Sequence, residues 1–223
     1  IRDRDVTGVQ TCALPISSGL SRRFGTNKLL ADFCGQPMLC RAFDATATPG
    51  IAARIVVTRS EEVQALCRAH SVPVLLHSLP GRNDTVRLGL SALLEQQPEL
   101  SGCMFLPGDQ PLLRQETVET MTERFCHEQP SPTEWQKETE REIFRLGAVA
   151  DNDPTPLVGS PVLFGSSFFS ELLTLPENKG GNVLLKKYPA QVRTICIADS
   201  AELLDADTPE VLQQLETIAR QKG

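Results

Sequence analysis

Residues 17–28 concentrate the residue types that bind phosphate. The segment reads Ser-Ser-Gly-Leu-Ser-Arg-Arg-Phe-Gly-Thr-Asn-Lys, so two glycines stand among hydroxyl, guanidinium and ammonium groups. Glycine lets backbone N–H groups approach anionic oxygens closely, and the cations offset the negative charges of a polyphosphate. The composition therefore predicts a polyphosphate site, and the alternative is a basic surface loop that contains glycine.

The spacing within this loop separates it from two common phosphate motifs. Five residues lie between Gly19 and Gly25, and no Lys-Ser or Lys-Thr pair follows directly, so the loop is not a Walker A motif. It also lacks the dinucleotide-binding pattern G-x-G-x-x-G. The loop instead follows the pattern G-x-S-x-R-F-G-x-x-K, whose members are Gly19, Ser21, Arg23, Phe24, Gly25 and Lys28.

This pattern resembles the signature loop of the MobA-like NTP transferase family, and it is most similar to that of the molybdenum cofactor cytidylyltransferases. In that family the loop directly follows the first β-strand. The resemblance runs from residue 18 to the C-terminus, and it implies that Arg23 and Lys28 are catalytic because they hold the phosphates and the leaving group. It further implies a set of nucleotide-binding residues in the loop, namely Ser18, Gly19, Ser21, Arg23, Gly25 and Lys28.

A carboxylate follows a second apolar run. Residues 103–106 read as a buried strand, and Gly-Asp-Gln-Pro follows at residues 108–111. Because open parallel sheets bind ligands at the carboxyl ends of their strands, Asp109 is expected near the phosphate loop, where a carboxylate suits Mg²⁺ and its phosphate ligands. The family carries Gly-Asp-x-Pro here with aspartate as metal ligand, which implies that Asp109 is catalytic and binds the metal. The alternative is an aspartate turn at a strand end.

Two further stretches resemble family motifs. Gly81 and Thr85 match the positions that meet the base of the nucleotide. The sequence Leu-Asp-Ala-Asp-Thr-Pro at residues 204–209 resembles the family's Asp-x-Asp-Thr-Pro. Asp205 is a candidate second metal ligand, because a second carboxylate often completes a Mg²⁺ site. Asp207 is expected to be the N-cap of the last helix.

The alternation of strand and helix patterns predicts an α/β fold. We expect a single doubly wound, Rossmann-like sheet, mostly parallel, with helices on both faces, as in nucleotide-diphospho-sugar transferases. The rhythm breaks in the polar, proline-punctuated segment 129–157, where we expect a strand at 142–149 and a loop at 151–156. The other expected strands cover residues 54–58, 72–76, 103–106, 160–164 and 192–197.

Residues 1–16 depart from the family pattern. The family begins with an apolar strand, whereas residues 6–16 contain Gly8 and Pro15, which a buried central strand tolerates poorly. The same residues match the in-frame translation of a common sequencing adapter. We therefore predict that residues 1–16 are a non-native segment that replaces the first strand, ahead of one nucleotidyltransferase domain at residues 17–223. A genuine, divergent N-terminus is the alternative.

Composition narrows the class of protein. The net charge of −6 over 223 residues argues against nucleic-acid binding, and no apolar run approaches the roughly 18 residues of a membrane span. The seven cysteines form no C-x-x-C pair, which favours reduced thiols, and no secretory signal is recognised. These features predict a cytoplasmic protein that binds neither nucleic acid nor membrane.

The resemblance implies a reaction and a cofactor. The expected activity is Mg²⁺-dependent transfer of CMP from CTP to the phosphate of a molybdopterin-type cofactor, with release of pyrophosphate. CTP, or another NTP, and the phosphorylated pterin are the implied small-molecule partners, and a molybdenum hydroxylase apoenzyme is a further candidate partner.

Three alternatives stay open. The first is a guanylyltransferase of the molybdenum cofactor, although such enzymes tend to carry Gly-Gly where this chain has Ser18 before Gly19. The second is a cytidylyltransferase acting on methylerythritol phosphate, although those enzymes carry His-Asp-Ala-x-Arg-Pro where residues 107–111 read Pro-Gly-Asp-Gln-Pro. The third is a non-catalytic nucleotide-binding module that delivers cofactor to an apoenzyme.

Overall fold

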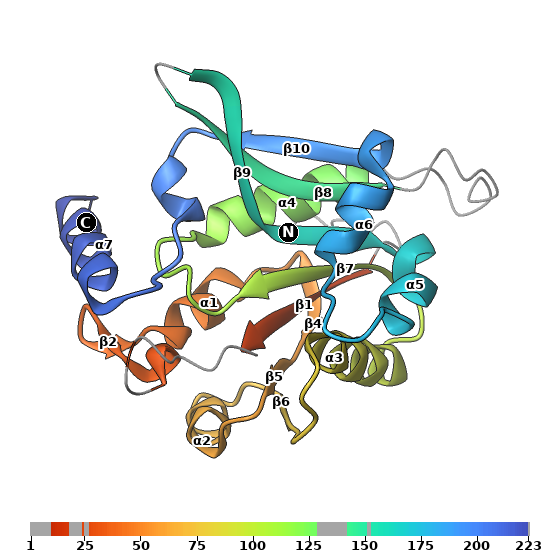
Figure 1. Ribbon diagram of the computed structural model, residues 1–223, viewed down its shortest axis with the longest axis horizontal. Coiled ribbons are helices and arrows are strands. Elements are labelled where there is room, and N and C mark those ends of the chain that lie inside the picture. The colour runs from red at the N-terminus through yellow and green to blue at the C-terminus, as the bar shows by residue number, and fades with distance from the viewer. Residues whose placement is uncertain (1–9, 18–23, 25–26, 129–141, 151–152, 223) are drawn as a thin grey trace, which may run out of the picture.

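One eight-stranded sheet organises the chain (Figure 1). The computed structural model describes residues 10–17, 24, 27–128, 142–150 and 153–222. Across the sheet the strands follow the order β10 (Val192–Ile197), β8 (Ile143–Ala150), β9 (Asp153–Gly165), β7 (Leu100–Pro107), β1 (Gln10–Ser17), β5 (Val56–Thr58) and β6 (Val74–Leu76), and β4 (Ile51–Arg54) also pairs with β1. A separate two-stranded sheet joins β2 (Asp32–Phe33) to β3 (Gln36–Pro37).

The helices connect these strands. The α-helices are α1 (Leu39–Ala45), α2 (Glu61–Ala69), α3 (Arg82–Gln96), α4 (Gln115–Glu128), α5 (Phe169–Leu173), α6 (Asn182–Lys187) and α7 (Pro209–Lys222). Short 3-10 helices are η1 (Lys28–Leu30), η3 (Ser166–Phe168), η4 (Pro189–Gln191) and η5 (Ser200–Leu203). Within the described ranges no helix combines the length and the apolar character that a bilayer span requires.

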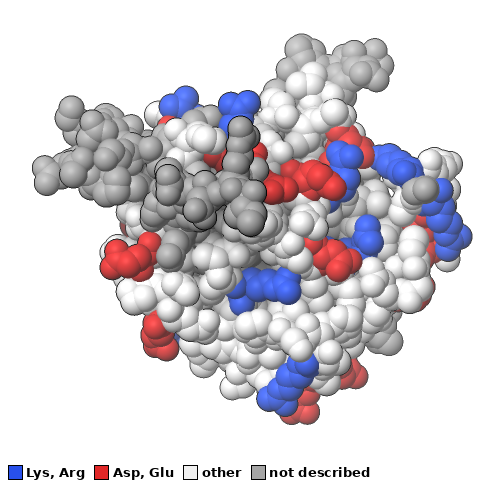
Figure 2. Space-filling view, turned by 180° about the vertical axis from the view of Figure 1, so that it is seen from behind, with Lys and Arg blue, Asp and Glu red and all other residues white. Residues whose placement is uncertain are grey.

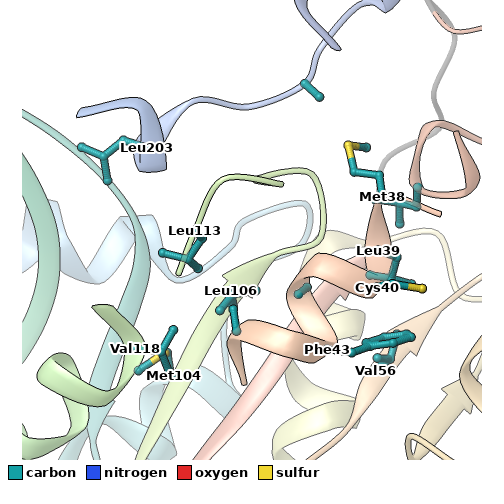
Figure 3. Close-up of a cluster of buried hydrophobic side chains, with 14 of the residues drawn as sticks. Met38, Leu39, Cys40, Phe43, Val56, Met104, Leu106, Leu113, Val118 and Leu203 are labelled. Carbon is teal, nitrogen blue, oxygen red and sulfur yellow. The ribbon is translucent and has the colours of Figure 1, made fainter. Parts of the chain in front are cut away.

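Helices cover both faces of the sheet, as predicted. Successive residues of a strand point to opposite faces, and Val56 belongs to one buried cluster whereas Val57 belongs to the other. The first core cluster takes side chains from α1, α2, α4 and α7, and the second takes them from α3, α5 and α6. The first cluster includes Leu39 of α1, Leu106 of β7 and Leu113 of the segment that follows β7 (Figure 3).

Most neighbouring strands run parallel. Strand β1 is parallel to β4, β5 and β7, β5 is parallel to β6, and β10 is parallel to β8, whereas β9 is antiparallel to both β7 and β8. The carboxyl ends of β7, β1, β5 and β6 therefore meet at one edge of the sheet, which is where ligands of such folds bind.

Strand β9 corrects the loop expected at 151–156. It begins at Asp153, which pairs with Ala150 of β8, so residues 153–156 belong to a long antiparallel hairpin arm. Strand β7 pairs only with residues 162–165 of β9. Among the described strands, the earlier part of β9 therefore pairs with β8 alone, and its other side is an edge of the sheet. Proline is tolerated at a strand edge because no ladder hydrogen bond is lost there, so Pro154 and Pro156 were misleading as loop signals.

Residues 10–17 form the central strand β1 between β7 and β5. Pro15 stands opposite Leu106, and the hydroxyl of Thr11 donates a hydrogen bond to the Gly50 carbonyl across 2.6 Å. The expectation that Pro15 would disfavour a strand is wrong for this backbone. The non-native origin of residues 1–16 stays a prediction.

Candidate functional site

Lys28 lies between two aspartates from distant parts of the chain. It begins η1, directly after Asn27, whose side chain accepts the Leu29 N–H across 3.2 Å and caps the turn. The Lys28 ammonium forms an ion pair with Asp109 and a second one, 3.0 Å long, with Asp207 Oδ1. The Lys28 and Asp109 side chains are only 14% and 20% exposed, so solvent screens this pair weakly.

The electrostatics of the cluster favour a charged Lys28. Burial alone would lower the pKa of Lys28, but the hydrogen bond and charge of Asp109, followed by those of Asp207, outweigh it and raise the pKa. Although Asp205 keeps contact with solvent, the protein packed around its carboxylate raises its pKa, and the negative charge of Asp109 raises it further. A hydrogen bond with Gln110 offsets part of this effect.

The three carboxylates carry more charge than Lys28 balances. With Asp109, Asp205 and Asp207 ionised, one ammonium group leaves an excess of two negative charges. Across the described ranges, no three His, Cys, Asp or Glu side chains are grouped as a complete metal site. Mg²⁺ is commonly bound by one or two carboxylates together with substrate phosphates rather than by a cage of protein ligands. Asp109 and Asp205 fit that kind of site.

Backbone packing fixes where Asp109 points. A Cβ atom at Gly108 would lie 2.9 Å from Leu39 Cδ1, so any larger residue would require the Leu39 side chain to shift. The Asp109 carbonyl then accepts the Ala206 N–H across 2.8 Å. Gln110 Nε2, from the next residue, donates to the Leu203 carbonyl across 3.4 Å. The segment after β7 is thereby joined to the segment before α7.

A buried acidic residue that the sequence did not indicate lies beside this junction. Glu202, in η5, has a completely buried side chain and pairs with Arg114, just before α4. The sequence gives little indication of this role, because Glu202 is one of several acidic residues in 199–210 and belongs to no recognisable motif.

Gly81 and Thr85, which were predicted to meet the base, lie where the chain passes from β6 into α3. The Gly81 N–H donates to Asp84 Oδ2 across 3.0 Å, which closes the first turn of α3. Thr85 is fully buried, and its hydroxyl lies 3.4 Å from His77 Nε2 rather than facing solvent. Sequence reasoning missed His77, which follows β6 and donates its backbone N–H to the Thr58 carbonyl across 3.0 Å.

His77 is held in its neutral form. Burial, and then the positive charge of Arg59, lower the pKa of His77 in spite of the nearby Asp84. Its Nδ1 atom is buried and has no hydrogen-bond partner within the part of the chain that the structure describes. Of the side chains at this corner, His77 therefore has spare capacity to bind a polar ligand.

The two parts of the candidate site lie along one edge of the sheet. From β7, which precedes Asp109, to β6, which precedes His77, there are three strand-to-strand steps, or roughly 14 Å. That span suits an extended nucleotide with its base at one end and its phosphates at the other. Five of the predicted loop residues lie outside the described residues, namely Ser18, Gly19, Ser21, Arg23 and Gly25.

Charges of both signs are interspersed on the rear face of the molecule (Figure 2). The described part of that face shows no gathering of Lys and Arg of the kind that a nucleic-acid backbone would require.

Comparisons with known proteins identify related sequences and folds. The family model of the MobA-like NTP transferase domain matches residues 16–192. A 3-deoxy-manno-octulosonate cytidylyltransferase of Neisseria meningitidis serogroup C is 33% identical over 97 residues, which are 43% of this chain and 38% of the relative. The enzyme of the same name from Chlorobium phaeobacteroides is 29% identical over 106 residues, 46% of this chain and 41% of the relative. The chain thus spans about two fifths of the length of these curated relatives.

Solved structures share the fold over nearly the whole chain. Rv0371c from Mycobacterium tuberculosis has a TM-score of 0.75 at 21% identity and covers 94% of this chain and 98% of its own, and its manganese complex has a TM-score of 0.69. A nucleotidyl transferase from Methanothermobacter has a TM-score of 0.72 at 16% identity, over 96% and 99%. A CMP:2-keto-3-deoxy-manno-octonic acid synthetase complexed with CTP has a TM-score of 0.70 at 17% identity, over 96% and 100%. The predicted fold class is therefore confirmed.

Proposed function

The chain belongs to the family of MobA-like NTP transferase domains, and from this premise we propose that it transfers CMP from CTP to an acceptor phosphate and releases pyrophosphate. The observation that carries the proposal is the position of Lys28 between Asp109 and Asp207 at the carboxyl edge of the sheet. An ammonium group and a surplus of carboxylates at one point suit a triphosphate that arrives with a divalent cation.

The reaction is a displacement at the α-phosphorus of CTP. An oxygen of the acceptor phosphate forms a bond to that phosphorus, and the bond to the bridging oxygen of the β-phosphate breaks, so pyrophosphate leaves with the bonding electrons. The acceptor phosphate is already anionic and needs no general base. Catalysis then consists of positioning the reactants and stabilising the developing charge.

Each predicted residue has a role in that displacement. Lys28 exchanges its carboxylate partners for phosphate oxygens of the nucleotide, and Arg23 holds the leaving pyrophosphate. Asp109 and Asp205 would hold Mg²⁺, which would neutralise charge on the phosphates and the leaving group. A structural neighbour, Rv0371c, has been solved as a complex with manganese, which is consistent with a divalent cation in this proposal.

The nucleotide base lies at the opposite end of the site. We assign it to the Gly81 turn, where His77, rather than the buried Thr85, offers a free polar atom. Because Nε2 faces the Thr85 hydroxyl, the Nδ1 atom of the neutral imidazole can donate or accept one hydrogen bond, according to its tautomer, with one polar atom of cytosine. The preference for CTP over GTP is further supported by Ser18, which precedes the first loop glycine.

We assign the acceptor to the molybdopterin class. The sequence of residues 159–164 and the Gly180-Gly181 pair resemble the pterin-facing parts of the family. Asn83 Oδ1 accepts the Asn178 N–H across 3.2 Å, which brings the start of α3 beside the loop that leads to Gly180. A molybdenum hydroxylase apoenzyme would receive the product.

A second candidate acceptor has a specific observation in its favour. The 33% identity to a 3-deoxy-manno-octulosonate cytidylyltransferase extends over 97 residues. A sugar acid would attack through a hydroxyl group, which must lose its proton, so this reaction needs a base that the phosphate acceptor does not.

The cellular setting follows from the substrates. CTP and the phosphorylated pterin are intracellular metabolites, so we propose that the protein works in the cytoplasm. Five cysteines, Cys34, Cys40, Cys67, Cys126 and Cys196, are free thiols, as is usual for a reducing compartment.

Pyrophosphate release tests the proposal. Each of the four NTPs is supplied with Mg²⁺ under three conditions. The reaction contains no acceptor, or the molybdopterin cofactor, or 3-deoxy-manno-octulosonate. Release with CTP and the pterin alone supports the proposal, and release with GTP would correct the base. Release with the sugar acid would establish the second candidate. Tight CTP binding without release under any condition would leave the delivery module as the function.

A further inference from the structure

The carboxylate of Glu202 is the most completely enclosed charge near the candidate site. Its side chain has no exposed surface. Oε1 accepts hydrogen bonds from Arg114 Nε across 2.9 Å and from the terminal guanidinium nitrogen across 2.6 Å. Oε2 accepts the Arg114 backbone N–H across 3.1 Å and the Thr117 hydroxyl across 2.6 Å. Both carboxylate oxygens therefore accept hydrogen bonds from within the protein.

These contacts join two segments that carry the site's aspartates. Arg114 and Thr117 follow Asp109 along the chain, and Glu202 precedes Asp205. The same two segments meet again through the Ala206 N–H and the Asp109 carbonyl, and through the Gln110 amide and the Leu203 carbonyl. Of these junctions, only that of Glu202 involves a charged pair.

Electrostatic repulsion makes such a junction necessary. Asp109 lies on one segment and Asp205 and Asp207 lie on the other, and Asp109 and Asp207 both contact the ammonium group of Lys28. Like charges on facing segments drive the segments apart, most strongly when no cation lies between them. Lys28 relieves this repulsion only until it turns to the nucleotide.

A buried ion pair is a poor source of net stability. Desolvation of the carboxylate cancels most of the attraction, and apolar side chains of similar volume often stabilise a fold as well or better. A directional network such as that of Glu202 instead sets the relative position of the groups it joins.

We propose that Glu202 is a positioning residue, which holds the segment 199–207 against the segment 107–117 so that Asp109 and Asp205 stay close enough to share one divalent cation. This inference rests on the proposed function and adds to it the device that keeps the acidic cluster assembled. Glu202 contacts no reacting group and acts through Arg114 and Thr117.

A matched control is available at the opposite edge of the sheet. Glu142, just before β8, has a side chain that is 12% exposed and pairs with Arg193 across 3.0 Å. Its carbonyl accepts the Gly165 N–H, which places it at the end of β9 that pairs with the beginning of β7, away from Asp109. Glu142→Gln therefore perturbs a similarly enclosed pair without touching the site.

The experiment compares Glu202→Gln, Glu142→Gln and the unchanged protein. Electron paramagnetic resonance measures Mn²⁺ binding in the presence of CTP, and NMR measures hydrogen exchange at the Ala206 amide, with folding verified by circular dichroism. For Glu202→Gln we expect about tenfold weaker Mn²⁺ binding and faster exchange at Ala206. For Glu142→Gln we expect a lower Tm with both readouts unchanged. Thr117→Val removes only one hydrogen bond to Glu202 and should shift both readouts in the same direction. It takes the place of Glu202→Gln in the comparison if that variant does not fold.

Three outcomes would overturn the inference. Unchanged Mn²⁺ binding and Ala206 exchange in a folded Glu202→Gln, or in Thr117→Val when that variant stands in for it, would make Glu202 a stabilising residue only. Equal weakening in Glu142→Gln would point to general loss of stability. Absence of Mn²⁺–CTP binding in the unchanged protein would instead refute the proposed function itself, and with it the role of Glu202.

Discussion

The ammonium group of Lys28 donates a hydrogen bond to Asp207 across 3.0 Å, although 179 residues separate the two in the sequence. The contact brings the end of the predicted phosphate loop against the segment that precedes α7. Because Asp109 pairs with the same ammonium group, three distant segments converge on one cation. A nucleotide that draws Lys28 away would expose the carboxylates to a metal ion at the same time.

Replacing Lys28 by alanine should weaken triphosphate binding. A charge-assisted hydrogen bond contributes about 1.5–3 kcal/mol, so we expect the Kd for CTP, measured by isothermal titration calorimetry, to rise by roughly tenfold or more. Lys187→Ala is the control, since Lys187 forms an ion pair with Glu171 on an exposed surface. Equal CTP affinity in the Lys28 variant and the unchanged protein would remove the phosphate role.

His77 should make stability depend on pH in a defined window. Its folded-state pKa lies below the usual value of 6.5, because burial and then Arg59 disfavour the charged form. The unfolded chain therefore takes up a proton first as the pH falls. Neutral His77 therefore contributes to the free energy of unfolding above pH 6.5. This contribution is lost as the pH falls from 6.5 toward the lower folded-state pKa.

Urea unfolding at pH 7.5 and pH 5.5 measures this effect. The unchanged protein should lose more unfolding free energy between the two pH values than His77→Asn, which cannot titrate. The same loss in both proteins would show that other groups carry the pH dependence.

The sequence allowed the positions of strands and of some site residues to be predicted. Asp109 follows β7, as the apolar run at 103–106 indicated. Such features follow from residues close together in the chain. The first turn of α7, by contrast, is capped by Thr208, which accepts the Val211 N–H across 3.3 Å, so the N-cap expected at Asp207 is wrong.

Tertiary contacts account for what the sequence did not show. Asp207 is drawn to Lys28 instead of to the helix, and Glu202 meets Arg114 from 88 residues away. Neither pairing leaves a periodic signal, because each depends on how two loops meet after the sheet has formed. The roles of the predicted site residues stay proposals.

Replacing Pro15 by valine should stabilise the protein. Pro15 stands opposite Leu106 in the central strand, where proline supplies no backbone N–H and valine has the higher strand propensity. We expect the free energy of unfolding to rise by about 1 kcal/mol, seen as a higher urea midpoint. An unchanged midpoint would show that β1 accommodates proline without cost.

Asp205→Asn should raise the stability of the protein and lower its activity. The folded-state pKa of Asp205 is raised, by the surrounding protein first and by Asp109 second, so its ionised form destabilises the fold above that pKa. Removing the charge should increase Tm at neutral pH, and the gain should vanish as the pH falls through the raised pKa. Pyrophosphate release at limiting Mg²⁺ should fall in the same variant. A lower Tm at neutral pH would contradict this account of the charge.

Asp109→Asn provides the most direct test of catalysis. Strand β7 is buried on both faces and ends at Pro107, so the backbone that carries Asp109 is anchored whatever its side chain. Asparagine keeps the shape of the side chain, and Lys28 retains Asp207 as a partner, so Tm should change little.

The activity of this variant should nonetheless collapse. If the metal supplies several kcal/mol of transition-state stabilisation, loss of the Asp109 charge should lower turnover by about a hundredfold or more. Mg²⁺-dependent pyrophosphate release and thermal unfolding are measured side by side, with Asp44→Asn as the control, since Asp44 is exposed and pairs with Arg41 within α1. If Asp109 is a metal ligand, the variant should lose turnover while the protein stays folded. Near-normal turnover in Asp109→Asn, or unfolding of that variant, would therefore make Asp109 a structural turn residue.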